Sequence, residues 1–372
     1  MPLSFLIAGG GTGGHLYPGV AVARELIARV PDARVTFVGT AAGLEARVIP
    51  REGFTLDVIR STGLKGQSLA TLARSLALLP LSAIDAWRVI SRHCPSIVVG
   101  VGGYSSGPVV LIAALRGTPT LLMEQNAMPG LTNRLLAPVV SAAAVAFQDS
   151  VRVFGDKAFV SGNPVRRGFF ESGGAASGHY QREETHGHGV LPPGAVRVLV
   201  FGGSQGAHAI NVAMVDAAPT LAIGTPRLVI THQTGEQDLD MVRSAYQRAG
   251  LDARVEPFLF AMDQEMKSAD LVVSRAGSTT LAELAATGRA SILVPLPTAT
   301  DDHQRKNALA VAAQGGARML EQRELSGDRV AGEILALAGD PGLRRSMEDA
   351  AKELARPDAA RVIVDEVLAI AR

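Results

Sequence analysis

The stretch Gly9–Gly19, GGGTGGHLYPG, decides the fold of this chain. It follows the apolar run Leu3–Ala8 and precedes the helix-like sequence VAVARELIARV at residues 20–30. An apolar run, closely spaced glycines and an amphipathic helix are typical of a βα unit that presents backbone N–H groups to a phosphate. Glycine allows close approach, and the helix N-terminus is the positive end of a dipole. The stretch therefore predicts a phosphorylated ligand, such as a nucleotide.

The same glycines fit two familiar nucleotide motifs only in part. Residues Gly9–Gly14 match GxGxxG, but the dinucleotide fingerprint also needs an acidic residue about 20 positions later, at the end of the second strand. That strand is VTFVGT, Val35–Thr40, and it contains no acid. The ATP-binding P-loop has Lys and then Ser or Thr after its last glycine, whereas this chain has His15 and Leu16. The loop thus argues against NAD and against a P-loop ATPase.

The composition indicates a folded chain with large hydrophobic cores. Its 372 residues exceed the usual size of a single core, 47% of them are hydrophobic, and the mean hydropathy is +0.21. Charged residues make up 19%, below the roughly 25% of typical soluble proteins, and the net charge is +1. A nearly neutral chain without a basic run offers nucleic acid no electrostatic footprint. We therefore expect two domains and no nucleic-acid partner.

Cysteine usage and the N-terminal sequence bear on the cellular compartment. The single cysteine, Cys94, excludes an internal disulfide and a Cys-based zinc site, and we expect it to be buried, in a reducing compartment. No basic segment precedes the first apolar run, so no signal peptide is expected. No uncharged apolar run reaches the ~18 residues of a transmembrane helix. The prediction is a cytosolic α/β protein.

Strand-like and helix-like runs alternate from the start of the chain. The strand-like runs are residues 5–9, 35–39, 97–104, 120–126 and 142–147, and the helix-like runs are residues 19–30, 41–53, 107–117 and a segment from Leu131. Continuous apolar strands that alternate with helices predict a parallel sheet covered on both faces. Right-handed crossovers place the C-terminal ends of the strands, where ligands bind, along one edge.

The opening pattern recurs in the second half of the chain. VRVLVFGGSQGAHAINVAM, residues 196–214, is again strand, glycine loop and helix, and it follows a Gly-, Ser- and His-rich segment at residues 171–194 that is typical of a flexible linker. We predict two similar α/β domains that face each other across a cleft, residues 1–166 and 195–357. An amphipathic helix at residues 358–372 is expected to pack back on the first domain.

The segment SRAGSTTLAE, Ser274–Glu283, ends a strand, turns at glycine and leads into a helix. The hydroxyls of Ser278, Thr279 and Thr280, with the N–H groups of this helix start, suit a diphosphate. Glu283, one turn later, suits ribose hydroxyls. The alternative is that Thr280 and Glu283 form a T-x-x-E capping box, which needs no ligand. Spacing alone leaves both interpretations open.

Three groups of side chains have the chemistry of metal ligands: linker histidines, a DDH run and a D-x-D pair (His179, His186 and His188; Asp301, Asp302 and His303; Asp238 and Asp240). The linker offers no fixed scaffold, and consecutive residues rarely converge on one ion. The D-x-D pair falls at a predicted helix start. We therefore expect no metal site.

Two segments that each follow a first-domain strand are rich in polar side chains. GGYSSGP at residues 102–108 and MEQNAMPGLTN at residues 123–133 share the predicted sheet edge with His15. They supply hydroxyl, amide and carboxyl groups of the kind that bind sugars: Tyr104, Ser105, Glu124, Gln125, Asn126 and Asn133. His15 and Glu124 are the two titratable residues here that are suited to act as a general base.

A leucine-rich stretch at residues 64–88 allows two interpretations. Its helical face carries Leu69, Leu72, Leu76 and Leu79, and basic residues flank it: Lys65, Arg74 and Arg88. An apolar face with basic flanks suits a surface of anionic lipid. Ordinary packing between two helices and a core is the alternative.

Seven segments occur in the order and spacing of a known family: GGGTGGHLYPGVAVARELI, GGYSSGP, EQNAMPGLTNRLLA, SGNPVRRGF, FGGSQGAHAIN, SRAGSTTLAEL and DDHQRKNA. The chain resembles the MurG family, the UDP-N-acetylglucosamine:lipid I N-acetylglucosaminyltransferases of bacterial peptidoglycan synthesis. The likeness covers nearly the whole chain outside the linker. It implies a GT-B fold, in which two Rossmann-like parallel-sheet domains face each other across a cleft and the C-terminal helix returns to the N-terminal domain.

The resemblance also implies roles for individual residues. Donor contacts are implied for Thr12, Gly13, Gly14, Asn126, Arg166, Ser204, Leu259, Ser278, Thr279, Thr280, Glu283 and Gln304. Among them, Ser204 would lie on the diphosphate side, the Leu259 backbone would hold the uracil, and Gln304 would contact the sugar hydroxyls. Acceptor contacts are predicted for Tyr104, Ser105 and Asn133, which lie in the polar segments of the first domain. Two positions depart from the family pattern: His303, where some members have Gln, and Met123, which replaces a His.

The implied reaction is an inverting transfer. The C4 hydroxyl of the MurNAc of lipid I attacks the donor sugar, UDP leaves, and the β-1,4 link of lipid II forms. Helix N-termini stabilise the leaving diphosphate, so neither a metal nor another cofactor is expected, and His15 or Glu124 takes the proton.

The resemblance also implies a set of partners and leaves alternatives. The partners are UDP-GlcNAc, lipid I, an anionic membrane surface on the cytoplasmic side of the inner membrane, and proteins of cell-wall synthesis or division. The alternatives are a UDP-N-acetylglucosamine 2-epimerase, an NAD(P)-dependent oxidoreductase and a non-catalytic nucleotide-sugar sensor.

Overall fold

The structure is a computed structural model that describes residues 3–61, 69–171, 191–203 and 207–371; for residues 69–77 and 300 it describes the backbone only. The chain forms two compact units. The first comprises Met1–Arg166 and Arg356–Arg372, and the second comprises Arg167–Ala355. The chain thus passes from the first unit into the second and back again. Most of the predicted linker, residues 172–190, lies outside the described residues.

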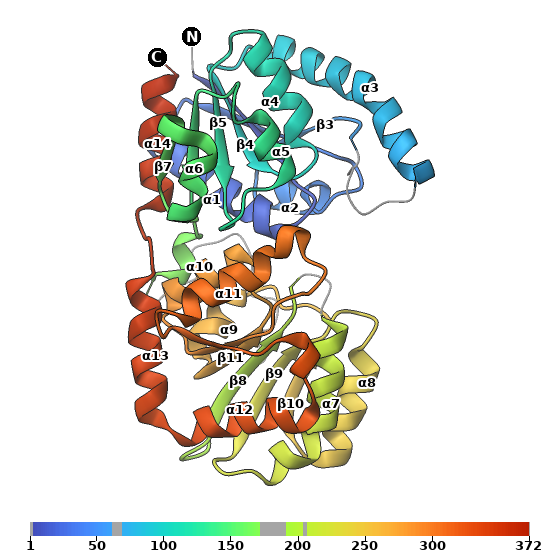
Figure 1. The fold of residues 1–372 in the computed structure, drawn as a ribbon, viewed down its shortest axis with the longest axis vertical. Coiled ribbons are helices and arrows are strands. Elements are labelled where there is room, and N and C mark those ends of the chain that lie inside the picture. The colour runs from blue at the N-terminus through green and yellow to red at the C-terminus, as the bar shows by residue number, and fades with distance from the viewer. Residues whose placement is uncertain (1–2, 62–68, 172–190, 204–206, 372) are drawn as a thin grey trace. The chain divides into compact units, whose positions relative to one another are not determined.

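The first unit is built on a seven-stranded sheet in the order β3-β2-β1-β4-β5-β6-β7 (Figure 1). All of its strand pairs are parallel, as the sequence predicted. The strands are β1 (Ser4–Gly9), β2 (Arg34–Gly39), β3 (Thr55–Val58), β4 (Ile97–Gly102), β5 (Thr120–Glu124), β6 (Ala142–Val145) and β7 (Ala158–Val160). The helices are α1 (Gly13–Arg29), α2 (Glu45–Arg51), α3 (Leu69–His93), α4 (Ser106–Leu115), α5 (Leu131–Leu136), α6 (Val151–Phe154) and α14 (Ala359–Ile370), with 3₁₀ turns at Gln148–Ser150 and Gly155–Lys157.

Alternate side chains of the strands fill a core on each face of this sheet. In β1, Phe5 and Ile7 pack with α1, α2 and α14, whereas Leu6 and Ala8 pack with α3, α4, α5 and α6. Helix α14 lies beside α1 (Figure 1). Three of its apolar residues are buried in the core, Ile363, Val364 and Val367. The C-terminal helix therefore completes the first unit.

The second unit is built on a six-stranded parallel sheet in the order β10-β9-β8-β11-β12-β13. Its strands are β8 (Val196–Phe201), β9 (Leu228–Gln233), β10 (Asp252–Glu256), β11 (Leu271–Ser274), β12 (Ser291–Leu293) and β13 (Ala317–Met319). Its helices are α7 (His208–Ile223), α8 (Leu239–Ala249), α9 (Met262–Ser268), α10 (Ser278–Thr287), α11 (His303–Ala312), α12 (Gly327–Gly339) and α13 (Pro341–Glu353), with 3₁₀ turns at Arg167–Phe169, Thr300–Asp302 and Gln322–Glu324.

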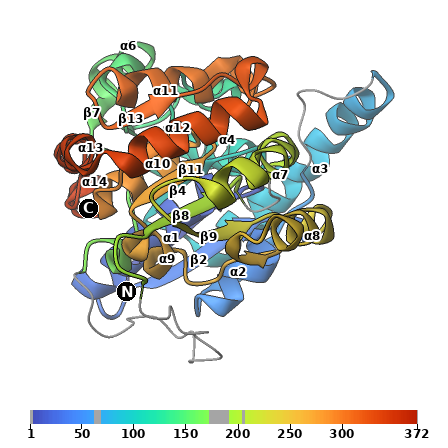
Figure 2. The same ribbon diagram turned by 90° about the horizontal axis from the view of Figure 1, so that it is seen from below.

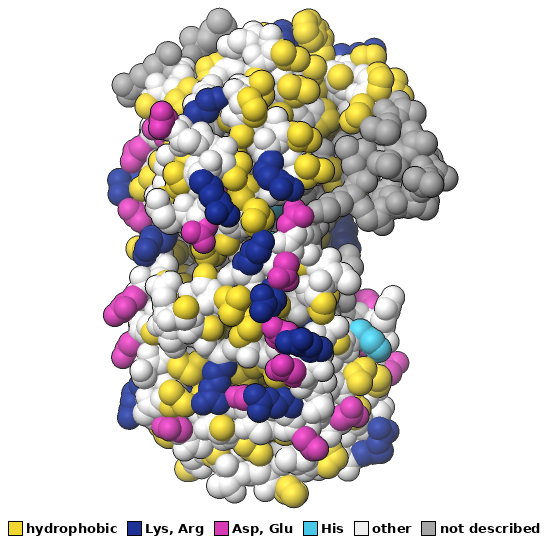
Figure 3. Space-filling view, viewed as in Figure 1, with side chains coloured by type: hydrophobic (Ala, Val, Ile, Leu, Met, Phe, Trp, Pro, Cys, Tyr) yellow, Lys and Arg dark blue, Asp and Glu magenta, His cyan; other side chains and the backbone are white. Residues whose placement is uncertain are grey.

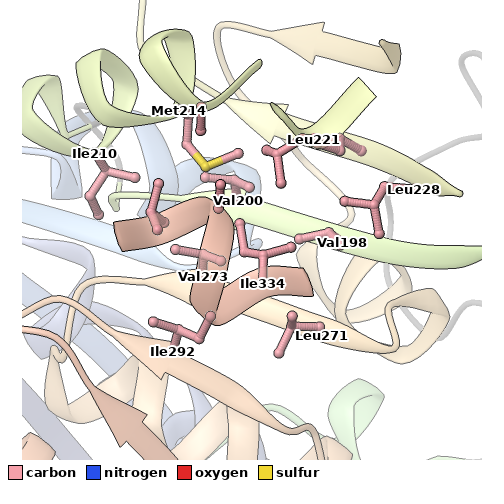
Figure 4. Close-up of a cluster of buried hydrophobic side chains, with 14 of the residues drawn as sticks. Val198, Val200, Ile210, Met214, Leu221, Leu228, Leu271, Val273, Ile292 and Ile334 are labelled. Atoms are coloured by element: carbon pink, nitrogen blue, oxygen red, sulfur yellow. The ribbon is translucent and has the colours of Figure 1, made fainter. Parts of the chain in front are cut away.

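Helices α7 and α8 lie side by side in both views (Figure 1 and Figure 2). Side chains of α7 and α12 meet those of β8, β11 and β12 in one apolar cluster (Figure 4). Its members include Val198, Val200, Ile210, Met214, Leu221, Leu228, Leu271, Val273, Ile292 and Ile334. Because the sheet is parallel, all of its strands end at the same edge, which positions the loops described below.

Two local predictions differ from the structure. The first helix begins at Gly13, inside the glycine stretch, rather than near residue 19, because Thr12 is already its extended N-cap. The predicted burial of Cys94 is wrong, since this residue is exposed. It follows the last residue of α3 with a φ of 40°, a left-handed conformation that ends helices at the protein surface. Among the described residues, no helix is long and apolar enough to span a membrane.

Candidate active site

Loops from three strands meet at the C-terminal edge of the first sheet, because β1, β4 and β5 are neighbours in it. A Cβ added at Gly103 would lie 2.4 Å from the Gly10 carbonyl oxygen. A Cβ added at Gly102 would lie 2.7 Å from Nδ1 of His15. The loops after β1 and β4 therefore pack so closely that a side chain does not fit, and the His15 ring rests against the β4 loop.

His15 lies in the first turn of α1 and interacts with Gln125, which follows β5. Nε2 of Gln125 donates to the Val101 carbonyl at 3.0 Å, and Oε1 of Gln125 lies 3.1 Å from Nδ1 of His15. An amide oxygen only accepts hydrogen bonds, so Nδ1 carries the hydrogen and donates it. Nε2 of the neutral imidazole then holds a lone pair, which is the group that a general base needs.

Glu124, the other candidate base, uses both carboxylate oxygens to bind the loop that follows β5. Its side chain is 3% exposed. Oε1 accepts from the backbone N–H of Asn126 at 2.9 Å and from Asn126 Nδ2 at 3.2 Å. Oε2 accepts from the Gly130 N–H at 3.0 Å and from Asn133 Nδ2 at 2.9 Å. Each carboxylate oxygen thus has two donors, and Glu124 holds residues 126–133 in shape.

The three predicted acceptor residues lie at the same edge of the first sheet. The Tyr104 ring covers the glycine loop, since its Cε1 would lie 3.3 Å from a Cβ added at Gly11. Ser105 is fully buried, and its hydroxyl has no hydrogen-bond partner among the described residues. Asn133 is buried and donates to the Met123 carbonyl as well as to Glu124. Tyr104 is the half-buried member of the three.

The start of α1 is partly exposed and lies beside an arginine. Thr12 is its N-cap, and the Thr12 side chain makes no capping hydrogen bond. Gly13 and Gly14, the first residues of the helix, are half-buried. The guanidinium of Arg166 lies 4.5 Å above the Tyr17 ring. That ring also lies 3.3 Å from a Cβ added at Gly13, so Tyr17 places Arg166 next to the first turn of α1.

In the second unit, one side chain joins two loops at the edge of the sheet. Gln233, the last residue of β9, donates from Nε2 to the Gly203 carbonyl at 2.7 Å. Its Oε1 accepts from the backbone N–H of Leu259 at 2.9 Å. The loop after β8 is thereby tied to the loop after β10. Ser204, predicted on the first of these loops, lies outside the described residues.

The start of α10 carries hydroxyl groups and no side-chain cap. Its N-cap is Gly277, and the helix begins at Ser278. Thr280 therefore lies inside the first turn, and the capping-box alternative is wrong, because that motif requires Thr280 to precede the helix. Ser278, Thr279 and Glu283 are buried, and Thr280 is half-buried. The hydroxyl-rich helix start remains consistent with an anion site.

Arg275, which the sequence patterns did not single out, lies directly after β11. It is 8% exposed, and Nη1 donates to the carbonyls of Val294 and Pro295 at 3.1 and 3.2 Å. Burial lowers the pKa of Arg275 to about 10, so it remains a cation at neutral pH. No described acid forms an ion pair with it. The sequence signal that could have identified Arg275 is its position between a buried strand and a hydroxyl-rich helix start.

Helix α11 is tied to the same edge by two amides. Oε1 of Gln304 accepts from the Leu296 N–H at 2.9 Å. Nδ2 of Asn307, which is fully buried, donates to the Ala276 carbonyl at 3.4 Å. These contacts hold Gln304 beside the ends of β11 and β12. The C-terminal edge of this sheet thus carries Leu259, the α10 start, Arg275 and Gln304.

The side chains that have the chemistry of metal ligands take part in helix starts and turns where the structure describes them. Asp238 is the N-cap of α8 and Asp240 lies in its first turn, as predicted, and Asp238 accepts from Asn211 Nδ2 at 2.7 Å. Asp301 and Asp302 both have positive φ, 53° and 56°. Within the described ranges, no group of three or more His, Cys, Asp or Glu is arranged to hold a metal ion. The linker histidines, His179, His186 and His188, lie outside the described residues.

The two halves of the chain match two family models. Residues 5–145 match the glycosyltransferase family 28 N-terminal domain, and residues 197–363 match the glycosyltransferase family 28 C-terminal domain. A relative from Pelobacter propionicus is 45% identical over 375 residues, which cover 98% of this chain and 99% of that protein. The chain belongs to glycosyltransferase family 28.

The relative from Pelobacter propionicus is named UDP-N-acetylglucosamine--N-acetylmuramyl-(pentapeptide) pyrophosphoryl-undecaprenol N-acetylglucosamine transferase. The crystal structure of Acinetobacter baumannii MurG superposes on this family 28 chain with a TM-score of 0.74 at 28% identity, and 99% of each chain is covered. With the two parallel sheets, this likeness confirms the GT-B fold. The chain is a glycosyltransferase, which rules out the oxidoreductase and the sensor.

The epimerase alternative shares only the fold with this family 28 chain. The UDP-GlcNAc 2-epimerase from Neisseria meningitidis, solved with UDP-GlcNAc, has a TM-score of 0.68 at 13% identity, over 99% of this chain and 100% of that one. The identity to the epimerase is far below the 45% found for the transferase from Pelobacter propionicus. The transferase is therefore the better-supported member of the pair.

Proposed function

We propose that this chain transfers N-acetylglucosamine from UDP-GlcNAc to the C4 hydroxyl of the MurNAc of undecaprenyl-linked lipid I, giving lipid II. The observation that carries the proposal is the 45% identity, over nearly all of both chains, to the relative named for transfer to a pyrophosphoryl-undecaprenol acceptor. The first unit supports it, because it holds a histidine with an accepting Nε2 at a ligand-binding sheet edge.

In this mechanism His15 is the general base. Its Nε2 takes the proton of the C4 hydroxyl while the hydroxyl oxygen bonds to the anomeric carbon of GlcNAc and the bond from that carbon to UDP breaks. Attack from the face opposite UDP inverts the anomeric carbon. Gln125 keeps the hydrogen on Nδ1 and so keeps Nε2 ready to accept. Glu124 and Asn133 act as positioning residues of the loop after β5.

The charge that develops on UDP is proposed to be stabilised by the second unit. The N–H groups and hydroxyls at the start of α10 face an anion favourably, and Arg275 supplies a full positive charge three residues before that start. The other proposed donor contacts are Thr12, Gly13, Gly14, Asn126, Arg166, Ser204, Leu259, Ser278, Thr279, Thr280, Glu283 and Gln304. Tyr104 is proposed to contact the acceptor, and the fully buried Ser105 is proposed to support the loop that carries Tyr104.

A single assay tests the reaction. The chain is incubated with UDP-GlcNAc labelled in the sugar, with and without a lipid I analogue, in the presence of EDTA. We expect labelled lipid product only when the acceptor is present, and EDTA leaves the rate unchanged because the protein itself supplies the positive charges. A labelled sugar product formed from UDP-GlcNAc alone would support the epimerase instead. If no labelled lipid product forms when the acceptor is present, the result contradicts the transferase function.

We further propose that the first unit docks on the cytoplasmic face of the bacterial inner membrane through an apolar surface. Figure 3 shows hydrophobic side chains gathered over α4 and α5. The large exposed hydrophobic residues on and next to α3, α4 and α5 are Leu79, Leu81, Ile84, Trp87, Leu111, Leu115, Leu131, Leu135 and Val139. Helix α4 contacts both α3 and α5. The predicted leucines Leu69, Leu72 and Leu76, with Lys65 and Arg74, fall where no side chain is described.

Basic side chains accompany the apolar surface. The Arg116 guanidinium lies 4.4 Å above the Trp87 ring, and Arg88 and Arg134 are exposed on α3 and α5. Apolar side chains that enter a membrane interface, next to cations that attract anionic headgroups, are the two components of peripheral membrane binding. Both components occur together on these three helices.

We expect the double substitution Leu115→Glu and Leu135→Glu to abolish binding to liposomes that contain anionic lipid. The two side chains are 71% and 69% exposed, so their replacement leaves the core intact while it places negative charge against the headgroups. Binding is measured by co-sedimentation, and UDP-GlcNAc affinity is expected to stay at the wild-type value. Ile223→Glu, at an 86% exposed position in the second unit, is the matched control and retains binding. Wild-type sedimentation of the double variant contradicts the proposal.

A further inference from the structure

Glu45 is a fully buried acid that the mechanism above does not use. It is the first residue of α2, and its side chain is 0% exposed. Oε2 accepts from the Gly11 N–H at 2.8 Å, and Oε1 accepts from the Thr40 N–H at 2.9 Å and from the Thr40 hydroxyl at 2.8 Å. No lysine, arginine or histidine among the described residues forms an ion pair with it. Its negative charge is therefore held by backbone N–H groups and one hydroxyl.

The space for this carboxylate is made by three glycines. A Cβ added at Gly10 would lie 2.4 Å from Cδ of Glu45, and one added at Gly39 would lie 2.5 Å from its Cγ. A Cβ added at Gly43 would lie 2.2 Å from Oε2. These glycines come from the loop after β1, the end of β2 and the approach to α2. They form a cavity that the Glu45 side chain fills.

The position of the carboxylate corresponds to that of a ligand in other βα units. In a dinucleotide site, the glycine loop after the first strand binds the pyrophosphate, and an acid at the end of the second strand binds the ribose. Here the glycine loop and the end of β2 are both bound to Glu45, through Gly11 and Thr40. A carboxylate, like a phosphate, accepts hydrogen bonds from N–H groups through its anionic oxygens.

We propose that Glu45 is a built-in anion of the first glycine loop: its carboxylate occupies the anion site at the Gly11 N–H, excludes a nucleotide diphosphate from that N–H group, and ties Gly11 to Thr40. Glu45 is then a specificity-determining and positioning residue, because the tied loop leads directly into the helix turn that carries His15. This inference rests on the proposed transferase function, in which His15 is the base.

Two substitutions of Glu45 test the role of the charge. In Glu45→Ala the site is emptied, and we expect kcat/KM for the acceptor to fall about 10²-fold because the His15 turn is no longer held in place. Formate, a small carboxylate, is expected to restore activity and to raise the Tm of this variant in a concentration-dependent way. Chloride at the same ionic strength does neither, and wild type shows no response to formate.

In Glu45→Gln the site stays filled, but the amide group that replaces one oxygen donates toward either Gly11 or Thr40, which are themselves donors. We expect low acceptor kcat/KM and no rescue by formate, since no space is left for it. Gly43→Ala adds a Cβ that collides with Oε2 of Glu45, so it displaces the carboxylate and is expected to lower acceptor kcat/KM as well. Gly332→Ala, where an added Cβ meets nothing within 4 Å, is the control and keeps wild-type activity.

Two outcomes would overturn the proposal. One is a Glu45→Gln variant that transfers as fast as wild type, because the charge would then be unnecessary. The other is a Glu45→Ala variant that gains no more Tm from formate than from chloride. If Glu45→Ala does not fold, Glu45→Gln and Gly43→Ala decide the question by the same kinetics. An inactive wild type counts against the transferase function alone, because the formate-dependent Tm still reports on the anion site.

Discussion

We expect His15→Ala to lower kcat about 10²–10⁴-fold, which is the usual contribution of a positioned general base. The expectation follows from the hydrogen-bond pattern, in which Gln125 receives the Nδ1 hydrogen and leaves Nε2 as an acceptor. The variant is expected to fold as wild type does, because His15 is half-buried and lies in the first turn of its helix. Turnover is measured with saturating donor and lipid I analogue.

The control for this variant is a histidine of the same unit that contacts β3 rather than the loops of the site. His93 ends α3, and its Nε2 lies 2.7 Å from Asp57. We expect His93→Ala to retain wild-type kcat. A His15→Ala variant that also retains near-normal kcat would show that another group takes the proton.

Glu124→Ala is expected to destabilise the first unit by about 2–3 kcal/mol, because it removes the acceptor of four hydrogen bonds, one of them fully buried. Each buried donor that loses its partner costs about 1–3 kcal/mol. The loss is measured as a shift of the first unit's transition in urea unfolding. Activity is measured at a temperature where the variant is still folded, and there we expect kcat to fall less than in His15→Ala.

Two further variants separate a structural role of Glu124 from a catalytic one. Glu124→Gln keeps the shape of the side chain but turns an amide N–H₂ toward two of the donors, so it is expected to be intermediate in stability. Asp156→Ala removes an exposed acid from the same unit and is expected to unfold as wild type does. An unchanged unfolding transition in Glu124→Ala, together with a 10²-fold or larger loss of kcat, would make Glu124 the base.

The two parallel sheets were predictable because strands buried on both faces appear in the sequence as continuous apolar runs between helices. The glycine loops were predictable for the same reason, since they follow these runs directly. The residues around His15 were also found, because each of their segments follows a strand of the same sheet. Local patterns therefore determined which loops meet at the sheet edge.

The contacts within the site depend on packing between residues far apart in the sequence. Gln125 lies 110 positions from His15, and Glu45 lies 34 positions from Gly11, so no local pattern links them. Glu45 falls in a segment predicted to be helical, where an acid usually faces solvent, and only the three surrounding glycines make room for it inside. The T-x-x-E pattern at Thr280 left a capping box and a ligand site open, and the structure excludes the capping box because the helix starts two residues earlier, after a glycine cap.

The first unit contains residues from both ends of the chain, so the two units are not expected to fold in the order in which they are synthesised. The first unit is begun by the earliest residues, but its core includes Ile363, Val364 and Val367 from beyond the second unit. Until those residues leave the ribosome, the apolar surface of α1 that α14 covers has no partner. The second unit, Arg167–Ala355, is continuous in sequence and has no such requirement. The second unit of the nascent protein is therefore expected to complete its folding before the first unit does. Until then, the apolar surface of α1 stays uncovered.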